Sequence, residues 1–302
     1  TEIYTLSLHD ALPIYWQAFP QTRPWIGDLD GDGKPEVLFT YATSREQANS
    51  ELFCFDSGGR IRWRYKPGRE VRSRKERFAP PYVIRIVMVV DGGEGSPPVV
   101  LVAGSHDFAY AGQIAALSPQ GKVLREYWHS GHIAAAAAAD LDRDGRPEVY
   151  LGAAHNASKS ASLIALDPED FGGASREDNL DYQLLDLGPA RELGRIILPR
   201  SELSMRMHIP AFQNEVTAQS GRISLAVDQL PPSAERTRAP RTVFEFGAGL
   251  RLLGTKYNRE FRQVYEEEVR RGRIAEYDLE ADLARMKQVT VVTPWRGKGA
   301  GR

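Results

Sequence analysis

Two short segments of the chain carry carboxylates at alternate positions. The first reads DLDGDGKPEV from Asp28 to Val37, and the second reads DLDRDGRPEV from Asp140 to Val149. Carboxylates at the first, third and fifth positions of such a loop can converge on one cation, because the glycine at the sixth position permits a sharp turn. A ligand set made only of oxygen suits Ca²⁺ better than zinc. The spacing therefore predicts two calcium loops.

Both acidic loops offer the same candidate ligands: three aspartates, the backbone carbonyl of the seventh residue and a glutamate at the ninth position. These are Asp28, Asp30, Asp32, the Lys34 carbonyl and Glu36 in the first acidic loop, and Asp140, Asp142, Asp144, the Arg146 carbonyl and Glu148 in the second. An EF-hand would instead need a bidentate glutamate at position twelve, where Phe39 and Leu151 stand. Aspartates that form turns without metal are the alternative. If metal binds, its expected role is structural, because it would neutralise the clustered carboxylates.

A weaker copy between the two loops indicates a repeat. The segment DGGEGSPPVV begins at Asp91 and has Gly93 and Gly95 in place of the second and third aspartates, so we predict no metal there. The spacing between this copy and the next is kept over a long stretch, which pairs Asp91 with Asp140, Pro98 with Pro147 and Leu117 with Leu166. A register held this long indicates a structural repeat.

Around each loop the hydrophobic pattern is that of short β-strands. Apolar runs precede the loops at 85–90 and 132–139, and others follow the first loop at 37–41 and 52–55. Residues 60–65 alternate strictly, which predicts a half-exposed strand with Ile61, Trp63 and Tyr65 on one face and three arginines on the other. The alanine run at 134–139 has high helix propensity, but its place in the repeat predicts an innermost strand.

Four short strands in a unit of this length suit one blade of a β-propeller. We therefore predict an all-β fold, an incomplete β-propeller at 15–257 with three clear four-stranded blades and a degenerate fourth that includes 195–199, 222–230 and 242–247. For residues 258–302 we predict a helical C-terminal extension and a tail. Asn258 should cap its first helix and Gly272 end it, and 277–289 should form the second helix. Because closure removes the edges of a propeller, we expect further blades upstream.

The segment WIGDLDGDGKPEV at 25–37 resembles the FG-GAP repeat of integrin-α-type β-propellers, which also occurs in many bacterial secreted proteins. The resemblance implies Ca²⁺ bound between the first two strands of a blade, with the ligands named above. This sequence departs from the family pattern at the ninth position, where Asp is usual and Glu36 and Glu148 stand. The resemblance covers about half of the chain, because nothing after Asp167 carries the motif.

Two weaker features could contribute to a ligand site. His106 and His155 occupy the same place in successive units, and with His132 they could form a ligand-binding rim. Solvated loop histidines are the alternative. The nine basic residues between Arg60 and Arg77 could bind an anionic polymer, phospholipid headgroups or a partner domain, or could simply form a solvated edge strand and loop.

The composition excludes several classes of protein. The 302 residues contain 39 Lys plus Arg against 40 Asp plus Glu, and 42% are hydrophobic, which excludes a wholly disordered chain and disfavours a polycationic nucleic-acid binder. No apolar run is long enough for a membrane helix. The single Cys54 excludes an internal disulfide. The sequence has no nucleophile elbow, Walker loop, HExxH or GxGxxG, so it predicts no catalytic residue.

The first fourteen residues, TEIYTLSLHDALPI, resemble the translation of a common sequencing-adapter oligonucleotide, codon by codon. We interpret residues 1–14 as an artefact and set them aside from the fold; an evolved amphipathic segment is the alternative. The natural chain is then expected to begin near Tyr15, inside a gene whose upstream part is lost. A signal peptide or a membrane attachment is expected only in that missing sequence.

These observations predict a non-catalytic, calcium-stabilised module for binding or scaffolding in a larger extracytoplasmic protein, where millimolar Ca²⁺ fills weak sites. The expected partner is a protein or a carbohydrate, not a nucleic acid. Some propeller-type polysaccharide lyases resemble this arrangement too. In that alternative, the three histidines and the arginines of 60–77 would bind and act on an acidic polysaccharide. The sensor domain of a membrane receptor is a second alternative.

Overall fold

The computed structural model describes residues 23–43, 46–92, 95–106, 109–230 and 239–297. The interpreted adapter segment at 1–14 and the expected start near Tyr15 lie outside the described residues, as do the last residues of the expected C-terminal tail.

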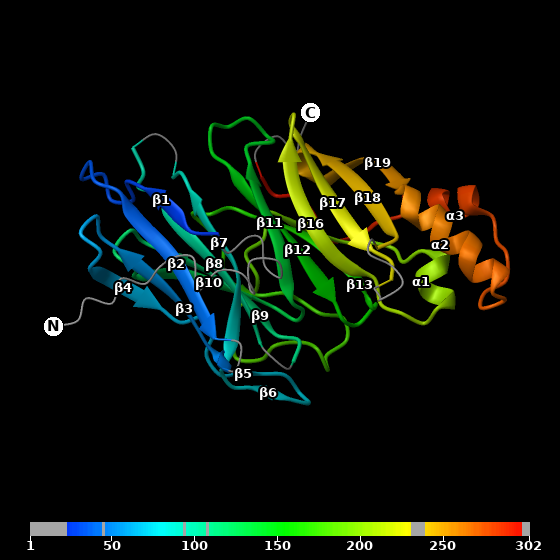
Figure 1. Ribbon diagram of the computed structural model, residues 1–302, viewed down its shortest axis with the longest axis horizontal. Helices are drawn as coiled ribbons and strands as arrows, with labels where there is room; N and C mark the ends of the chain where they lie inside the picture. The colour runs from blue at the N-terminus through cyan, green and yellow to red at the C-terminus, as the bar shows by residue number, and fades with distance from the viewer. Residues whose placement is uncertain (1–22, 44–45, 93–94, 107–108, 231–238, 298–302) are drawn as a thin grey trace.

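The described residues form four larger sheets that follow one another along the chain (Figure 1). The first sheet comprises β1 (Trp25–Gly27), β2 (Glu36–Thr43), β3 (Glu46–Phe55) and β4 (Ile61–Tyr65). The second comprises β7 (Tyr82–Val90), β8 (Val99–His106), β9 (Gly112–Leu117), β10 (Val123–His129) and β14 (Gly173–Ala174). The third comprises β11 (Ile133–Ala139), β12 (Glu148–His155), β13 (Ser160–Leu166), β15 (Gly194–Ile197) and β20 (Thr290–Thr293). The fourth comprises β16 (Phe212–Gln219), β17 (Arg222–Asp228), β18 (Arg241–Gly247) and β19 (Arg251–Tyr257).

The smaller elements lie in the connections and after the fourth sheet. The hairpin of β5 (Val71–Arg72) and β6 (Arg77–Phe78) lies between the first and second sheets in sequence, and α1 (Glu202–Arg206) precedes the fourth sheet. A short 3-10 turn at Ala248–Leu250 joins β18 to β19, and α2 (Arg259–Arg270) and α3 (Leu279–Arg285) follow β19. The protein is thus predominantly β, as its sequence predicted. No helix in the described ranges is long and apolar enough to cross a membrane.

Three apolar cores lie between successive sheets, and strand alternation explains them. In β8, Val100 and Val102 pack toward the first sheet, whereas Leu101 and Ala103 pack toward the third. A strand buried on both faces needs an unbroken apolar sequence, because successive side chains point to opposite sides. This accounts for the run VVLVA in β8. The third core joins the third and fourth sheets, and Tyr150 contributes to it.

The alanine run forms a strand and not a helix. Residues Ile133–Ala139 form β11, with Ala135 in the core toward the fourth sheet and Ala136 in the core toward the second. This strand packs against β7 on one side and β16 on the other. Small side chains suit a strand between two neighbours, and here tertiary packing outweighs helix propensity.

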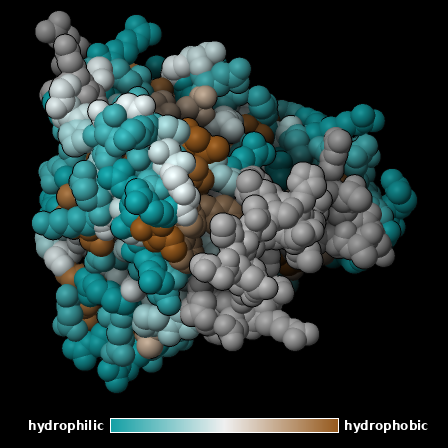
Figure 2. All heavy atoms as spheres, turned by 60° about the vertical axis from the view of Figure 1, so that its left-hand side comes forward, coloured by the Kyte–Doolittle hydropathy of each residue, from teal (hydrophilic) through white to brown (hydrophobic). Residues whose placement is uncertain are grey.

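The outward faces of the first and fourth sheets differ. Opposite its buried face, the first sheet carries Phe39, Phe53 and Phe55, and it exposes Ile26 by 68% and Ile61 by 51%. Figure 2 turns this side of the molecule forward and shows apolar patches within a mainly hydrophilic surface. On the fourth sheet, Glu245 alternates with buried phenylalanines and pairs with Arg222 and Lys256 across the strands.

The strict alternation expected for residues 60–65 is wrong at Ile61, which it predicts on the same face as Trp63 and Tyr65. Trp63 and Tyr65 pack in the core between the first and second sheets, but a bulge between Cys54 and Phe55 places Ile61 opposite Phe55. A bulge inserts an extra residue and therefore reverses the facing of everything beyond it. Ile61 consequently belongs to the outward face.

The later strands also differ in detail from the expected degenerate blade. Residues 194–197 form β15, which pairs with β13 as part of the third sheet. The fourth sheet uses two strands that the pattern did not indicate, β16 and β19.

The C-terminal segment contains the expected helices and one unexpected strand. The Asn258 side chain accepts a hydrogen bond from the Phe261 amide at 2.9 Å and caps α2, and Gly272 follows the helix with a φ of 68°. The second helix, α3, is shorter than the expected 277–289. Beyond it, β20 returns to pair with β15 of the third sheet.

Candidate metal centres

Both acidic loops connect the first two strands of a sheet. The first acidic loop joins β1 to β2, where Gly27 pairs with Glu36, and the second joins β11 to β12, where Ala139 pairs with Glu148. In Figure 1 both turns lie along the upper edge of the molecule. The two loops therefore occupy equivalent places in the first and third sheets.

The first aspartate of each loop organises its turn. Asp28 accepts hydrogen bonds from the Gly31 amide at 2.8 Å and the Gly33 amide at 2.9 Å. Asp140 accepts from the amides of Asp144 at 3.1 Å and Gly145 at 3.0 Å. Side-chain oxygens that accept from amides a few residues later are the usual means by which aspartate fixes a turn.

The glycine at the sixth position is required by the backbone. Gly33 has a φ of 82° and Gly145 a φ of 88°. Apart from the adjacent residues of the chain, no heavy atom lies within 4 Å of a Cβ placed at either glycine, so crowding is not the reason for glycine. The left-handed conformation itself disfavours any residue with a side chain.

The glutamate at the ninth position closes each loop. Glu36 accepts a hydrogen bond from the Leu29 amide at 2.9 Å, and Glu148 accepts from the Leu141 amide at 3.1 Å. Both glutamates are buried, with 1% and 5% of their surface exposed. The side chain that departs from the family pattern thus spans the loop and brings a carboxylate to its interior.

The carboxylates converge in both loops but not equally. In the second acidic loop, one oxygen from each of four side chains lies within 4.8 Å of the others: Asp140, Asp142, Asp144 and Glu148. In the first, the corresponding group is Asp28, Asp30 and Glu36. Asp32 accepts from the Lys34 amide at 2.8 Å, as Asp144 does from the Arg146 amide at 3.0 Å. The Lys34 and Arg146 carbonyls stay predicted ligands.

An arginine lies across the first cluster. Arg62 of β4 contacts Asp30 at 2.5 Å and Glu36 at 2.7 Å through its two terminal nitrogens. Its hydrogen bond lowers the pKa of the Asp30 carboxyl, and the two carboxylates raise the pKa of the Arg62 guanidinium. The alternation of residues 60–65 predicts a solvated face for this arginine. It lies on β4, which pairs with β3 and not with β2, the strand that begins at Glu36, so no local pattern indicates its role.

In the second cluster, three of the four carboxylates have no comparable cation among the residues that the structure describes. Within the described ranges, no Lys or Arg side chain pairs with Asp140, Asp142 or Glu148, and the Tyr150 hydroxyl donates to Glu148 at 3.0 Å. Burial, with the nearby Asp142 charge, raises the pKa of Glu148 to about 7. Burial and the Asp144 charge also raise the pKa of Asp142. A divalent cation would supply the missing positive charge, and the all-oxygen donor set fits Ca²⁺.

The three histidines of the expected rim are each held by protein groups. His106 donates to the Ala79 carbonyl at 2.9 Å and accepts from the Ala109 amide, and His132 donates to the Ala109 carbonyl at 2.5 Å. His155 contacts Ser158 at 2.6 Å and Glu177 at 3.0 Å. Ala109 thus joins the first two histidines, while the third belongs to a different group of side chains.

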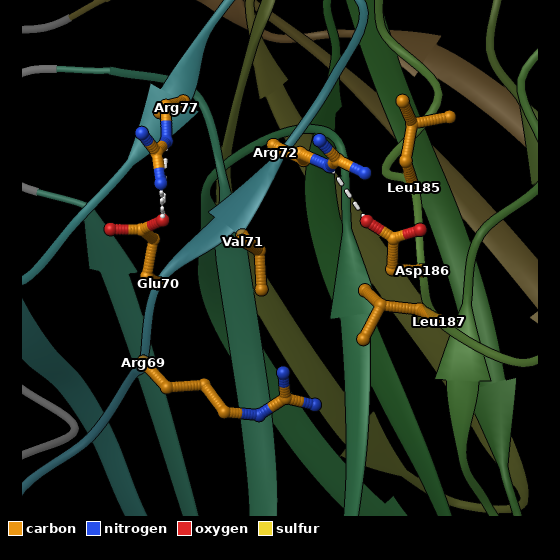
Figure 3. A pocket seen from close by; sticks show the side chains of 8 residues that line it. All are labelled: Arg69, Glu70, Val71, Arg72, Arg77, Leu185, Asp186 and Leu187. Carbon is orange, nitrogen blue, oxygen red and sulfur yellow. Dashed lines mark hydrogen bonds and ion pairs between the residues drawn. The ribbon is translucent and has the colours of Figure 1, made fainter.

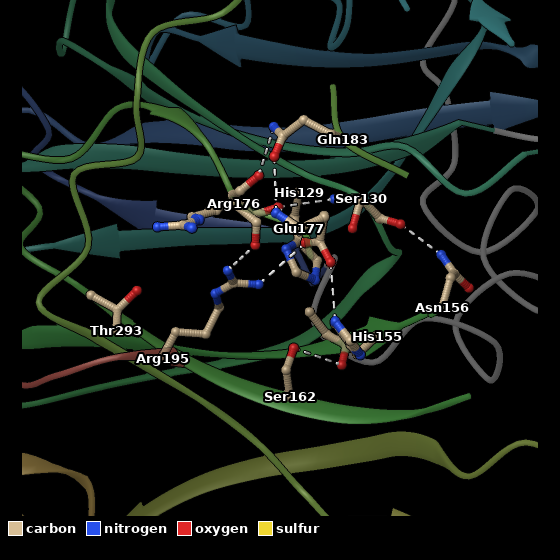
Figure 4. Close-up of polar contacts among 12 residues, drawn as sticks. His129, Ser130, His155, Asn156, Ser162, Arg176, Glu177, Gln183, Arg195 and Thr293 are labelled. Atoms are coloured by element: carbon tan, nitrogen blue, oxygen red, sulfur yellow. Dashed lines mark hydrogen bonds and ion pairs between the residues drawn. The ribbon is translucent and has the colours of Figure 1, made fainter. Parts of the chain in front are cut away.

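That group is a buried polar network which sequence reasoning missed (Figure 4). Arg195, with no exposed surface, contacts Glu177 at 3.2 Å and Glu192 at 3.4 Å. Burial alone would raise the pKa of Glu177, but contacts with the surrounding side chains, first the His155 hydrogen bond and with it the Arg195 charge, lower it to about 2. Burial lowers the pKa of the His129 imidazole to about 4. The network ties the connection between β13 and β15 to the second and third sheets.

Comparisons with known proteins leave the class of protein open. No family model matches the chain, and no curated protein matches it. One similar solved structure is a protein of unknown function from Bacteroides caccae, with a TM-score of 0.27 and 11% identity over 75% of this chain and 79% of that one. Another is the V. cholerae biofilm matrix protein Bap1, with a TM-score of 0.23 and 13% identity over 78% of this chain and 48% of that one. At these TM-scores neither likeness carries an argument.

Proposed function

We propose that the chain is a calcium-stabilised β-propeller module of the FG-GAP type, with two structural Ca²⁺ sites and a binding or scaffolding role. The observation that carries this proposal is the duplication of one loop geometry at equivalent places in the first and third sheets, with buried glutamates closing both loops. A turn formed by aspartates alone needs no buried ninth-position carboxylate. A buried carboxylate needs a partner of opposite charge, and a bound cation would supply one to Glu148, where no Lys or Arg of the described residues does.

The sheet order supports the propeller part of the proposal. Four sheets follow in chain order, and each of the middle two buries both faces against its neighbours. Among the strands that begin the sheets, β11 packs against both β7 and β16. Such nearest-neighbour packing of sequential meanders is what blades of a propeller do. The apolar outward face of the first sheet supports a further blade on that side.

The bound cation would act through charge. In each loop the aspartates and the glutamate would hold it, and Ca²⁺ would neutralise carboxylates that otherwise repel one another and stiffen the turn between two strands. Weak sites of this kind fill at the millimolar concentrations found outside the cytoplasm. The proposal therefore places the module in an extracytoplasmic protein and assigns no catalytic residue.

Calorimetric titration with Ca²⁺, paired with thermal unfolding in Ca²⁺ and in chelator, tests the proposal. At a Ca²⁺ concentration one hundred times the dissociation constant, binding should stabilise the fold by about 2.7 kcal/mol per site. The double variant D142N/E148Q should remove the second site, and D30N/E36Q the first. Asp91→Asn, at the leading position of the copy without further aspartates, is the matched control and should change nothing. An unchanged melting temperature between Ca²⁺ and chelator, with no heat of binding, would contradict the proposal.

A further inference from the structure

Two long connections meet at the edge of the molecule opposite the acidic loops. The connection from β4 to β7 carries the β5–β6 hairpin, and the other connection joins β13 to β15. The Leu185 amide donates to the Arg72 carbonyl at 2.7 Å, so that the second connection extends the hairpin. In repeat proteins, segments inserted between the regular units often gather on one face and form the binding surface.

The two connections enclose a hollow of about 230 Å³ (Figure 3). Its lining residues are Arg69, Glu70, Val71, Arg72, Arg77, Leu185, Asp186 and Leu187. Val71 and Leu187 belong to an apolar cluster beneath the hairpin, so the hollow has one firm apolar wall. Its volume is below that of a drug-sized pocket and suits one monosaccharide or one small ion.

Two arginines present unused hydrogen-bond donors there. Arg72 contacts Asp186 through Nε at 2.6 Å, and Arg69 contacts Glu126 through Nε at 3.2 Å. Within the described part of the chain, the terminal Nη atoms of both side chains bond no partner. The paired Nη donors of a guanidinium match two oxygens of a carboxylate or a sulfate. Arg69 also lies over the Trp128 ring, with its guanidinium carbon 5.4 Å from the ring centroid.

The existing ion pairs do not close the hollow to an anion. Arg72 and Asp186 have side chains that are 58% and 66% exposed. Ion pairs between exposed side chains contribute little to stability, so an incoming oxyanion can replace Asp186 at Arg72 or share the guanidinium with it.

We propose that this hollow binds an oxyanion-bearing ligand of monosaccharide size or smaller, held by the Nη donors of Arg69 and Arg72 against the apolar wall of Val71 and Leu187. The inference rests on the proposed function only in taking the chain as a binding module. It names the surface and the ligand class, and it does not depend on the acidic loops.

Calorimetric titration of the full chain with D-glucuronate, inorganic sulfate and D-glucose tests this inference. The parent protein should bind at least one of the two anions and bind glucose at least tenfold more weakly. R69Q/R72Q should weaken anion binding at least tenfold, because charged hydrogen bonds are lost. R222Q/R262Q makes the same charge change away from the hollow and should alter binding less than twofold. Asp186→Asn removes the competing carboxylate and should tighten binding several-fold.

Preference for glucuronate identifies sugar acids as the ligand source, and preference for sulfate identifies free tetrahedral ions. Both outcomes support the hollow. Unchanged binding in R69Q/R72Q, equal loss in R222Q/R262Q, or glucose binding as tight as anion binding would overturn it. Thermal unfolding of R69Q/R72Q in Ca²⁺ and in chelator separates the two proposals, because calcium stabilisation should persist when anion binding is lost.

Discussion

The first and second acidic loops share one turn geometry but balance their charge differently. In the first, Arg62 reaches from β4 to contact Asp30 and the buried Glu36. In the second, Glu148 is also buried; it accepts from the Leu141 amide and the Tyr150 hydroxyl and shares a hydrogen bond with the Asp142 carboxyl. An arginine of the protein therefore balances two carboxylates of the first loop, whereas within the described residues no Lys or Arg pairs with Asp140, Asp142 or Glu148 of the second. The comparison teaches that one motif can hold its clustered carboxylates with an arginine of the protein in one place and without one in another.

Removal of the internal cation should have the largest effect. Arg62→Met leaves Asp30 and the buried Glu36 without their partner, so in chelator the free energy of unfolding should fall by about 2 kcal/mol. Excess Ca²⁺ should recover most of this loss, because the variant makes the first loop resemble the second. Urea denaturation in chelator and in Ca²⁺ measures both values.

The neighbouring Arg64→Met serves as the control for that experiment, since Arg64 lies on the same strand and is exposed. It should change stability by less than about 0.5 kcal/mol. If the Arg62→Met variant were as unstable in Ca²⁺ as in chelator, the claim that Arg62 takes the place of a metal cation in the first loop would be contradicted.

Neutralising the ninth-position glutamate should have opposite signs in the two loops. The pKa of Glu148 is raised from 4.5 to about 7, so the folded apo protein binds its proton more tightly than the unfolded chain. Stability from this group is present below pH 4.5 and is lost as pH rises through 7. In chelator at pH 8, Glu148→Gln should therefore stabilise the fold by about 1–2 kcal/mol, and the gain should vanish at pH 5.

Glu36→Gln is the matched variant and should destabilise the fold at pH 8, because it breaks the contact with Arg62. Urea denaturation of both variants across this pH range provides the measurement. Equal losses in the two variants would show that the two glutamates have the same electrostatic surroundings, against the contrast described above.

The smallest expected effect, a loss of stability on replacing the sixth-position glycine, should be the same in both loops. Gly33→Ala and Gly145→Ala should each cost about 1 kcal/mol in chelator, because both glycines are left-handed and neither has an atom close enough to crowd a methyl group. Thermal unfolding of the pair tests whether the turns are alike. A clear difference between them would mean that the loops differ in backbone as well as in charge.

Patterns within short segments of the sequence predicted the features that depend on neighbouring residues, namely the acidic loops and individual strands. The alternation of aspartates located both loops, and the repeat register predicted the strand at the alanine run against its helix propensity. The pairing of Arg62 with the first loop depends on a strand far from it in sequence and on a bulge, which no hydrophobic period reveals. The Glu177 network lies where the repeat fades, and its members come from four separate segments.

The outward faces of the first and fourth sheets also bear on how such a chain could lengthen in evolution. A unit duplicated beside the first sheet would meet Phe39, Phe53 and Phe55, with the exposed Arg64 on the same face. A unit added beyond the fourth sheet would have to bury Glu245 with its two ionic partners, which is costly. An added unit would therefore bury three phenylalanines and Arg64 at the first sheet, but a carboxylate with two cationic partners at the fourth.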